Sequence, residues 1–107
     1  VISSATLSNE NYYLPQIFAL HQNYPNPFNP TTSINYDLPK NEFVRINVFD
    51  LMGREVKTLV NKEQVAGFRS VKWDANNNLG QPVSAGMYIY TIQAGEFRQT
   101  RKMVLLK

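Results

Sequence analysis

Cysteine is absent from the 107 residues of this chain. Without a thiol, the protein can form no disulfide bond, no zinc–thiolate site and no covalent intermediate on sulfur. The absence of cysteine is compatible with both reducing and oxidising compartments, so it leaves the location of the protein open.

Histidine occurs once, as His21. A catalytic histidine needs a nucleophile and an orienting group, and no Cys or acidic residue lies beside His21 at ligand spacing. No serine stands in a G-x-S-x-G sequence; the serines are Ser3, Ser4, Ser8, Ser33, Ser70 and Ser84. We therefore expect His21 to be a surface residue, and we predict a protein that is not an enzyme and needs no cofactor.

Long apolar runs are also missing. No stretch approaches the roughly 20 consecutive apolar residues of a membrane-spanning helix, so we expect no membrane insertion. No secretory signal peptide is visible, and the sequence begins at Val1 rather than at methionine. These features lead us to expect a fragment of a longer precursor, whose export signal would lie elsewhere.

Charge of one sign is only slightly in excess, with a formal net charge of +3. The Lys and Arg residues are spread along the chain without a long block, so nucleic acid is not an expected partner. Four of these 11 residues do fall among the last ten: Arg98, Arg101, Lys102 and Lys107. The hydrophobic fraction of 43% suffices for one modest core in a single domain.

Proline is concentrated in one stretch, residues 23–32, which we call the proline arch. Pro25, Pro27 and Pro30 fix φ and remove three backbone donors, so neither a helix nor a central strand can form there. Two rings, Tyr24 and Phe28, are expected to attach the arch to a core. Patterned sequence follows the arch and not the region before it, which predicts a linker from an upstream domain over residues 1–19 and one domain over residues 20–107.

Beyond the arch, apolar and polar residues alternate with a period of two, which indicates strands. One face carries Ile34, Tyr36 and Leu38 before Pro39; the next run carries Val44, Ile46 and Val48. Gly53 can provide the positive φ of a tight reversal. The further predicted strands are residues 55–60, 68–74, 87–94 and 97–106, with a polar loop over 61–66, turns over 76–82 and 94–96, and a short strand within 16–22. About seven short strands without a helix predict an all-β, antiparallel β-sandwich.

Five aromatic residues invite a sugar-binding interpretation, because flat rings stack on sugar faces: Tyr36, Trp73, Tyr88, Tyr90 and Phe97. The alternation of most of them along strands favours a sandwich core instead. Among these rings, Tyr36 is the best candidate for an exposed one. Tyr12 and Tyr13, in the linker, are expected to face solvent.

One turn contains oxygen side chains at alternate positions, as a calcium loop does. The candidate ligands are Asp74, Asn76 and Asn78. The glycine of such a loop falls one place late here, and Ala85 occupies the position of the bidentate glutamate. An Asn-rich turn whose side chains bind their own backbone is the favoured alternative.

The last residues abandon alternation: Met103, Val104, Leu105 and Leu106 are all apolar, between Lys102 and Lys107. A strand that is apolar on both faces is either covered or leaves one side bare. The terminus can therefore be a final core strand with basic residues at its edge, an exposed end that a partner protein grasps, or both. An exposed final strand can also pair edge to edge with a second copy of the chain.

Four blocks of the sequence, in order and in register, resemble the C-terminal sorting domains of the type IX secretion system. They are QNYPNPFNPTT from residue 22, preceded by Leu20; VFDLMGREV over residues 48–56; GMYIY over residues 86–90; and KMVLLK over residues 102–107. The resemblance implies an immunoglobulin-like sandwich over about residues 20–107. A more distant likeness, over residues 73–88, is to the immunoglobulin-like module of flagellar hook-capping proteins.

This resemblance implies a folded secretion signal attached to an N-terminal cargo domain. The parent protein would cross the periplasm of a Gram-negative, Bacteroidetes-like cell, and the outer-membrane translocon would recognise the signal. A sortase-like peptidase would then cleave before about residue 20, which releases the cargo or anchors it at the cell surface. The alternative is a carbohydrate-binding or structural immunoglobulin-like accessory module of a secreted enzyme.

Matched to the family's blocks, the residues take three roles. The arch residues Pro25, Asn26, Pro27 and Phe28 would orient the cargo linker against the domain. Gly53, Trp73, Gly86 and Tyr88 would be structural. The sorting signal itself would be Lys102, Met103, Val104, Leu105, Leu106 and Lys107.

Overall fold

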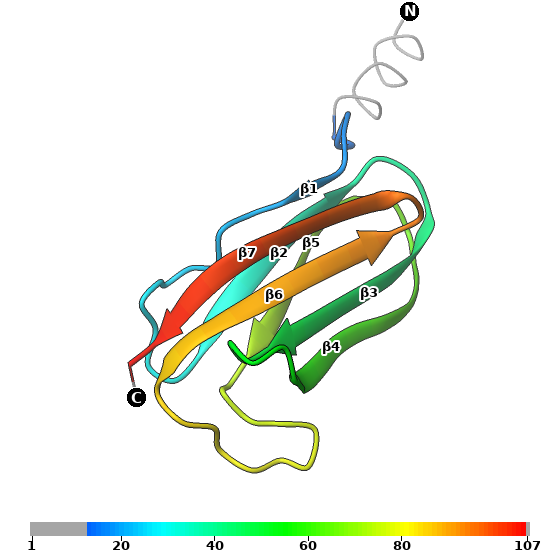
Figure 1. The fold of residues 1–107 in the computed structure, drawn as a ribbon. Helices are drawn as coiled ribbons and strands as arrows, with labels where there is room; N and C mark the ends of the chain where they lie inside the picture. The colour runs from blue at the N-terminus through cyan, green and yellow to red at the C-terminus, as the bar shows by residue number, and fades with distance from the viewer. Residues whose placement is uncertain (1–12, 107) are drawn as a thin grey trace, which may run out of the picture.

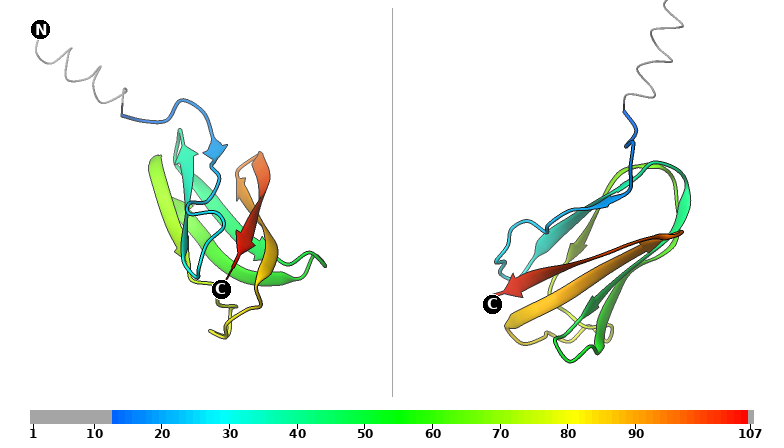
Figure 2. Two further views of the ribbon diagram at one scale, coloured as in Figure 1. Left: turned by 90° about the vertical axis from the view of Figure 1, so that its left-hand side faces the viewer. Right: turned by 45° about the horizontal axis from the view of Figure 1, so that its top comes forward.

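The computed structural model describes residues 13–106, and it contains seven strands in two antiparallel sheets (Figure 1). One sheet has the order β1-β2-β5 and the other has the order β4-β3-β6-β7. The strands are β1 (Ala19–Leu20), β2 (Thr32–Leu38), β3 (Glu42–Phe49), β4 (Glu55–Gln64), β5 (Gly67–Trp73), β6 (Gly86–Ala94) and β7 (Phe97–Leu105). The predicted all-β sandwich of about seven strands is confirmed, and Figure 2 shows its two layers.

The core lies between the two sheets and is made by alternate residues of the strands. In β2, Ile34, Tyr36 and Leu38 are buried, whereas their neighbours in sequence are not. β3 and β6 also bury alternate residues: Val44 pairs with Ala94, and Ile46 pairs with Ile92. The period-two pattern of the sequence thus gave the correct buried face of every central strand, because burial on one face forces alternation.

Two expectations, about one loop and one aromatic ring, were wrong. Of the loop expected over residues 61–66, only residues 65–66 lie between strands, because β4 continues to Gln64 and pairs along the whole of β3. The polar side chains of residues 61–64 are those of an exposed edge strand. The short strand expected within residues 16–22 is confirmed as Ala19–Leu20. Tyr36 is 1% exposed rather than solvent-facing, since its ring packs in the core and its hydroxyl reaches the half-buried side chain of Gln64.

The sandwich has two ends with different contents (Figure 1). At the linker end, residues 13–18 reach the domain and three short turns join β2 to β3, β4 to β5 and β6 to β7. The opposite end, which we call the far end, holds the proline arch, the β3–β4 turn, the long connection over residues 74–85 and the end of β7. Within residues 13–106, no helix is long and apolar enough to cross a membrane.

Candidate docking site at the end of the last strand

The proline arch and the end of β7 form one structure. Phe28 pairs with Leu105 as an isolated parallel bridge: the Phe28 N–H donates to the Val104 carbonyl oxygen at 2.9 Å, and the Leu106 N–H donates to the Phe28 carbonyl oxygen at 2.8 Å. β7 is an edge strand, so these bonds satisfy backbone groups that would otherwise be unpaired. The sequence predicted the arch and the terminal residues as separate features, and the structure brings them together.

Side chains of the arch region extend this contact along β7. The Asn26 Oδ1 atom accepts a hydrogen bond from the Val104 N–H at 3.0 Å, and Gln22 Nε2 donates to the Lys102 carbonyl oxygen at 2.7 Å. Phe28 is 1% exposed and its ring centroid lies 5.8 Å from that of Trp73, so this ring attaches the arch to the core as predicted. Tyr24 does not: it is 81% exposed, which corrects the expectation that both rings would be buried.

Asn23 holds the start of the arch through a buried polar network that the sequence analysis did not identify. Its N–H donates to the Tyr90 hydroxyl at 2.8 Å, and that hydroxyl donates to the His21 carbonyl oxygen at 2.7 Å. The Asn23 Nδ2 atom donates to Thr32 Oγ1 and to the Pro25 carbonyl oxygen. Burial raises the pKa of the Tyr90 phenol, which disfavours the ionised form of this hydroxyl further. The sequence signal that could have indicated this network is the position of Asn23, a polar residue just before the X-Pro dipeptides of the arch.

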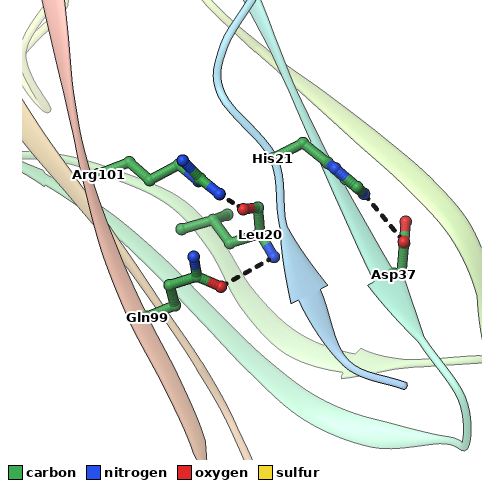
Figure 3. A network of polar contacts seen from close by, with 5 residues as sticks. All are labelled: Leu20, His21, Asp37, Gln99 and Arg101. Carbon is green, nitrogen blue, oxygen red and sulfur yellow. Dashed lines mark hydrogen bonds and ion pairs between the residues drawn. The ribbon is translucent and has the colours of Figure 1, made fainter.

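The segment before the arch bridges the two sheets (Figure 3). Two side chains of β7 reach the backbone of Leu20 in β1: Arg101 Nε donates to its carbonyl oxygen at 2.6 Å, and Gln99 Oε1 accepts from its N–H at 3.3 Å. On the outer face of the three-stranded sheet, His21 Nε2 lies 2.9 Å from Asp37 Oδ2 of β2. His21 is exposed, and its contact with Asp37 holds its side chain at the surface beside β1 and β2.

The side chains at the end of β7 alternate between the core and solvent. Met103 and Leu105 are buried, Val104 is half-buried, and Lys102 and Leu106 are exposed, Leu106 by 58%. Alternation therefore returns in the structure, although every residue from 103 to 106 is apolar. Lys107 lies outside the described residues. The backbone of this segment is fixed by the arch, while one apolar and one basic side chain remain accessible.

The β3–β4 turn lies at the same end and is organised by Asp50. Asp50 Oδ1 accepts hydrogen bonds from the N–H groups of Arg54 and Met52, and Asp50 Oδ2 accepts one from Arg54 Nε. The Arg54 N–H, followed by the Arg54 guanidinium and the Met52 N–H, lowers the pKa of the Asp50 carboxyl. Gly53 has φ +84°, so the predicted need for glycine at this reversal is confirmed.

The connection between β5 and β6 uses its asparagines to bind backbone groups. Asn77 Oδ1 accepts from the N–H groups of Leu79 and Gln81, and Asn78 Oδ1 accepts from the Thr58 N–H. Asn76 uses its carbonyl oxygen to accept from Trp73 Nε1. Of the three calcium candidates, Asp74 is exposed, the Asn78 side chain bonds to the backbone of β4, and the bond to Asn76 uses its backbone carbonyl rather than its side chain. Residues 13–106 hold no group of three His, Cys, Asp or Glu side chains suited to a metal ion.

Two further residues of the family's blocks sit where β6 begins. The Tyr88 ring packs edge-on against Trp73, with ring centroids 5.4 Å apart, and its hydroxyl donates to the Ser84 carbonyl oxygen. Gly86 opens the strand with φ +145°. These residues shape the core at the far end, beneath the arch.

The fold and this site define a seven-stranded β-sandwich whose last strand is held at its end by a proline-rich segment. A sequence profile of the family described as "Secretion system C-terminal sorting domain" matches residues 22–106. The chain belongs to this family. It is a C-terminal sorting signal for type IX secretion, and the sorting domain of this family is not itself catalytic.

Solved structures agree on the fold. The chain resembles dimeric latent PorU from Porphyromonas gingivalis, with a TM-score of 0.65 and 16% identity over 86% of this chain and 10% of that one. It resembles PorZ, a surface component of the type IX secretion system of P. gingivalis, with a TM-score of 0.56 and 18% identity over 84% of this chain and 11% of that one. The chain thus spans about a tenth of the length of either protein.

A third structure is FlgD from P. aeruginosa, with a TM-score of 0.55 and 27% identity over 69% of this chain and 58% of that one. This likeness agrees with the distant resemblance to the flagellar module that the sequence indicated. No curated protein matches the chain at a significant level. Proteins that carry this sorting domain are exported to the cell surface or secreted, and their sorting involves the secretion system and its sortase.

Proposed function

We propose that the far end of the sandwich is the surface that the type IX translocon binds, and that Lys102 and Leu106 are its principal contacts. The observation that carries this proposal is the arrangement at the end of β7: the backbone is fixed by Phe28 and Asn26, while these two side chains stay exposed. A preorganised surface loses little conformational entropy on binding. The exposed Leu106 supplies apolar contact, and Lys102 supplies charge.

The cargo is attached at the other end. Pro15 is buried and the Phe18 ring stacks on Phe97, with centroids 5.3 Å apart, so residues 15–19 of the linker dock on the sandwich. A peptidase needs a segment that can enter its active site in an extended form, which a docked segment resists. We infer that the sortase-like peptidase cuts before Pro15, after the protein has passed through the periplasm and the outer-membrane translocon.

An edge-to-edge dimer through the end of β7 is a competing use of this strand. The arch already occupies that edge at Val104 and Leu106. A second copy would have to displace the Phe28 bridge before it could pair there, and the proposal therefore has the domain bound by the translocon as a monomer.

The test uses the whole chain fused to a periplasmic reporter in a host with a working type IX system. Deletion of residues 103–107 is expected to abolish export, but it also removes buried Met103 and Leu105. The sharper variants are Leu106→Ser and Lys102→Ala, which alter exposed side chains and leave the core intact. They should retain the melting temperature and lose most reporter export, whereas Val65→Ser, at an exposed residue of the linker end, should export normally. Normal export by the Lys102→Ala, Leu106→Ser double variant would refute the proposal.

A further inference from the structure

The outer face of the four-stranded sheet is hollowed. A cavity of about 490 Å³ lies over β3, β4, β6 and β7, with its floor formed by Asn47 and Thr91. This volume falls within the range of about 300–1,000 Å³ that small-molecule sites occupy. The cavity is separate from Lys102 and Leu106, neither of which lines it.

Irregular pairing explains one wall of the cavity. β4 carries an extra residue relative to β3 twice, at Val56 and at Leu59, as the register shifts show. A β-bulge bends its strand and increases the local twist. Beside these bulges, Asn47 Nδ2 donates to Glu55 Oε1 and to Thr58 Oγ1, each at 3.1 Å, which draws the bent strand towards the sheet.

Two arginines supply the charge of the cavity. Arg45 pairs with Gln93, and Gln93 pairs with Arg98, so the two guanidinium groups flank one amide in a single row across β3, β6 and β7. Neither guanidinium group has an ion pair or hydrogen bond with any residue from 13 to 106. The two charges stand on alternate strands with Gln93 between them, and an anion bound there would accept hydrogen bonds from both guanidinium groups.

The remaining polar groups suit hydroxyls. The Glu55 carboxylate accepts hydrogen bonds from Asn47, Thr58 and Asn78 and keeps its negative charge, so the two arginines leave the lining with an excess of positive charge over this one carboxylate. Asn61 and Gln93 present amides, each with donors and an acceptor. A ligand that matches this lining carries a carboxylate at one end and several hydroxyl groups beside it.

We propose that this face binds an acidic oligosaccharide, with its carboxylate between Arg45 and Arg98. Recognition here rests chiefly on charge and hydrogen bonds, because the lining holds one half-buried ring, Phe49, whereas Trp73, Tyr88 and Tyr90 are buried in the core. The binding is a function additional to sorting, and it does not depend on the docking surface at the end of β7.

Isothermal titration of the 107-residue chain with trigalacturonic acid tests the proposal, with maltotriose as the neutral sugar. The acidic trisaccharide should bind, and its affinity should fall as salt is raised. Arg45→Gln and Arg98→Gln should each weaken binding by about tenfold, the loss expected for one charge-assisted contact. Lys72→Gln, an exposed cation on the other sheet, should bind like the wild type. All three variants should keep the wild-type melting temperature.

Several outcomes would overturn the proposal. These are no binding of trigalacturonic acid, equal binding of maltotriose, or unchanged affinity in both arginine variants. Triglutamate that binds as tightly as the sugar would assign the surface to acidic peptides instead, and sulfate that binds as tightly would reduce it to a nonspecific anion site. Export of a reporter should be unaffected by Arg45→Gln, so failure of this proposal leaves the sorting function untouched.

Discussion

The two ends of the sandwich are closed in different ways. At the linker end, short turns close each pair of strands locally, and the main contact with the incoming chain is the stack of Phe18 on Phe97. At the far end, residues distant in sequence hold one another: Asn26 bonds to Val104, and Phe28 lies against Trp73. Residues distant in sequence also meet near the linker end, where Phe18 stacks on Phe97, but at the far end such contacts pair the backbone of the last strand with the proline arch.

This difference suits a domain that follows varied cargo. A linker end that is closed by its own turns makes few demands on the sequence before it. A far end that is cross-connected presents one fixed surface, with Lys102 and Leu106 in constant positions. The comparison predicts that equivalent substitutions at the two ends have unequal effects on folding.

The largest difference is expected between two phenylalanines. Phe28→Ala should lower the free energy of unfolding by about 3–5 kcal/mol, because it empties a buried site against Trp73. Phe97→Ala should cost about 1 kcal/mol, because the ring is only half-buried, packing at the margin of the core and stacking on Phe18. Urea denaturation of the two variants measures both values. Similar losses would show that the ends are not energetically distinct.

Two tyrosine hydroxyls give the next comparison. Tyr90→Phe should cost about 1–3 kcal/mol, because it leaves the buried N–H of Asn23 without its acceptor and the His21 carbonyl without its donor. Tyr36→Phe removes a hydroxyl that bonds to the side chain of Gln64, which can turn to water instead, so its cost should stay below about 1 kcal/mol. Urea denaturation at neutral pH decides the order; a larger loss for Tyr36→Phe would reverse the interpretation.

The sequence predicted features that depend on local pattern. Alternation gave the buried faces of β2, β3 and β6, and Gly53 marked a reversal that needs positive φ. Burial on one face and backbone sterics act within a few residues, so they leave a readable trace.

Features set by long-range contact were missed or misassigned. Nothing local to Tyr36 or Tyr24 reveals which ring meets the core, since this depends on where other strands lie. The network of Asn23 with Tyr90 spans 67 residues, and the arch meets β7 across a similar gap. Such contacts arise from topology, and a pattern with a period of two cannot contain them.

A smaller effect is expected within the arch. Asn26→Ala removes the acceptor for the Val104 N–H and should cost about 1 kcal/mol, because this site is exposed and water can partly replace the side chain. Asn29→Ala, at another exposed asparagine of the arch, should be neutral. Amide hydrogen exchange gives the specific readout: exchange at Val104 should accelerate in the first variant alone. Unchanged exchange there would mean that Phe28 by itself holds the end of β7.

The smallest effect concerns pH at the β3–β4 turn. The Arg54 N–H and guanidinium and the Met52 N–H lower the pKa of Asp50 below its usual 3.8, so the folded state favours the ionised carboxylate. A carboxyl with a depressed folded pKa contributes stability above its unfolded pKa and loses it as pH falls through the folded value. The urea midpoint of the wild type should therefore decrease below about pH 4, and Asp50→Asn should show a shallower decrease, because it has no carboxylate to protonate. Parallel acid profiles for the two proteins would assign the acid sensitivity to other carboxyls and would leave the turn without a measurable share in closing the far end.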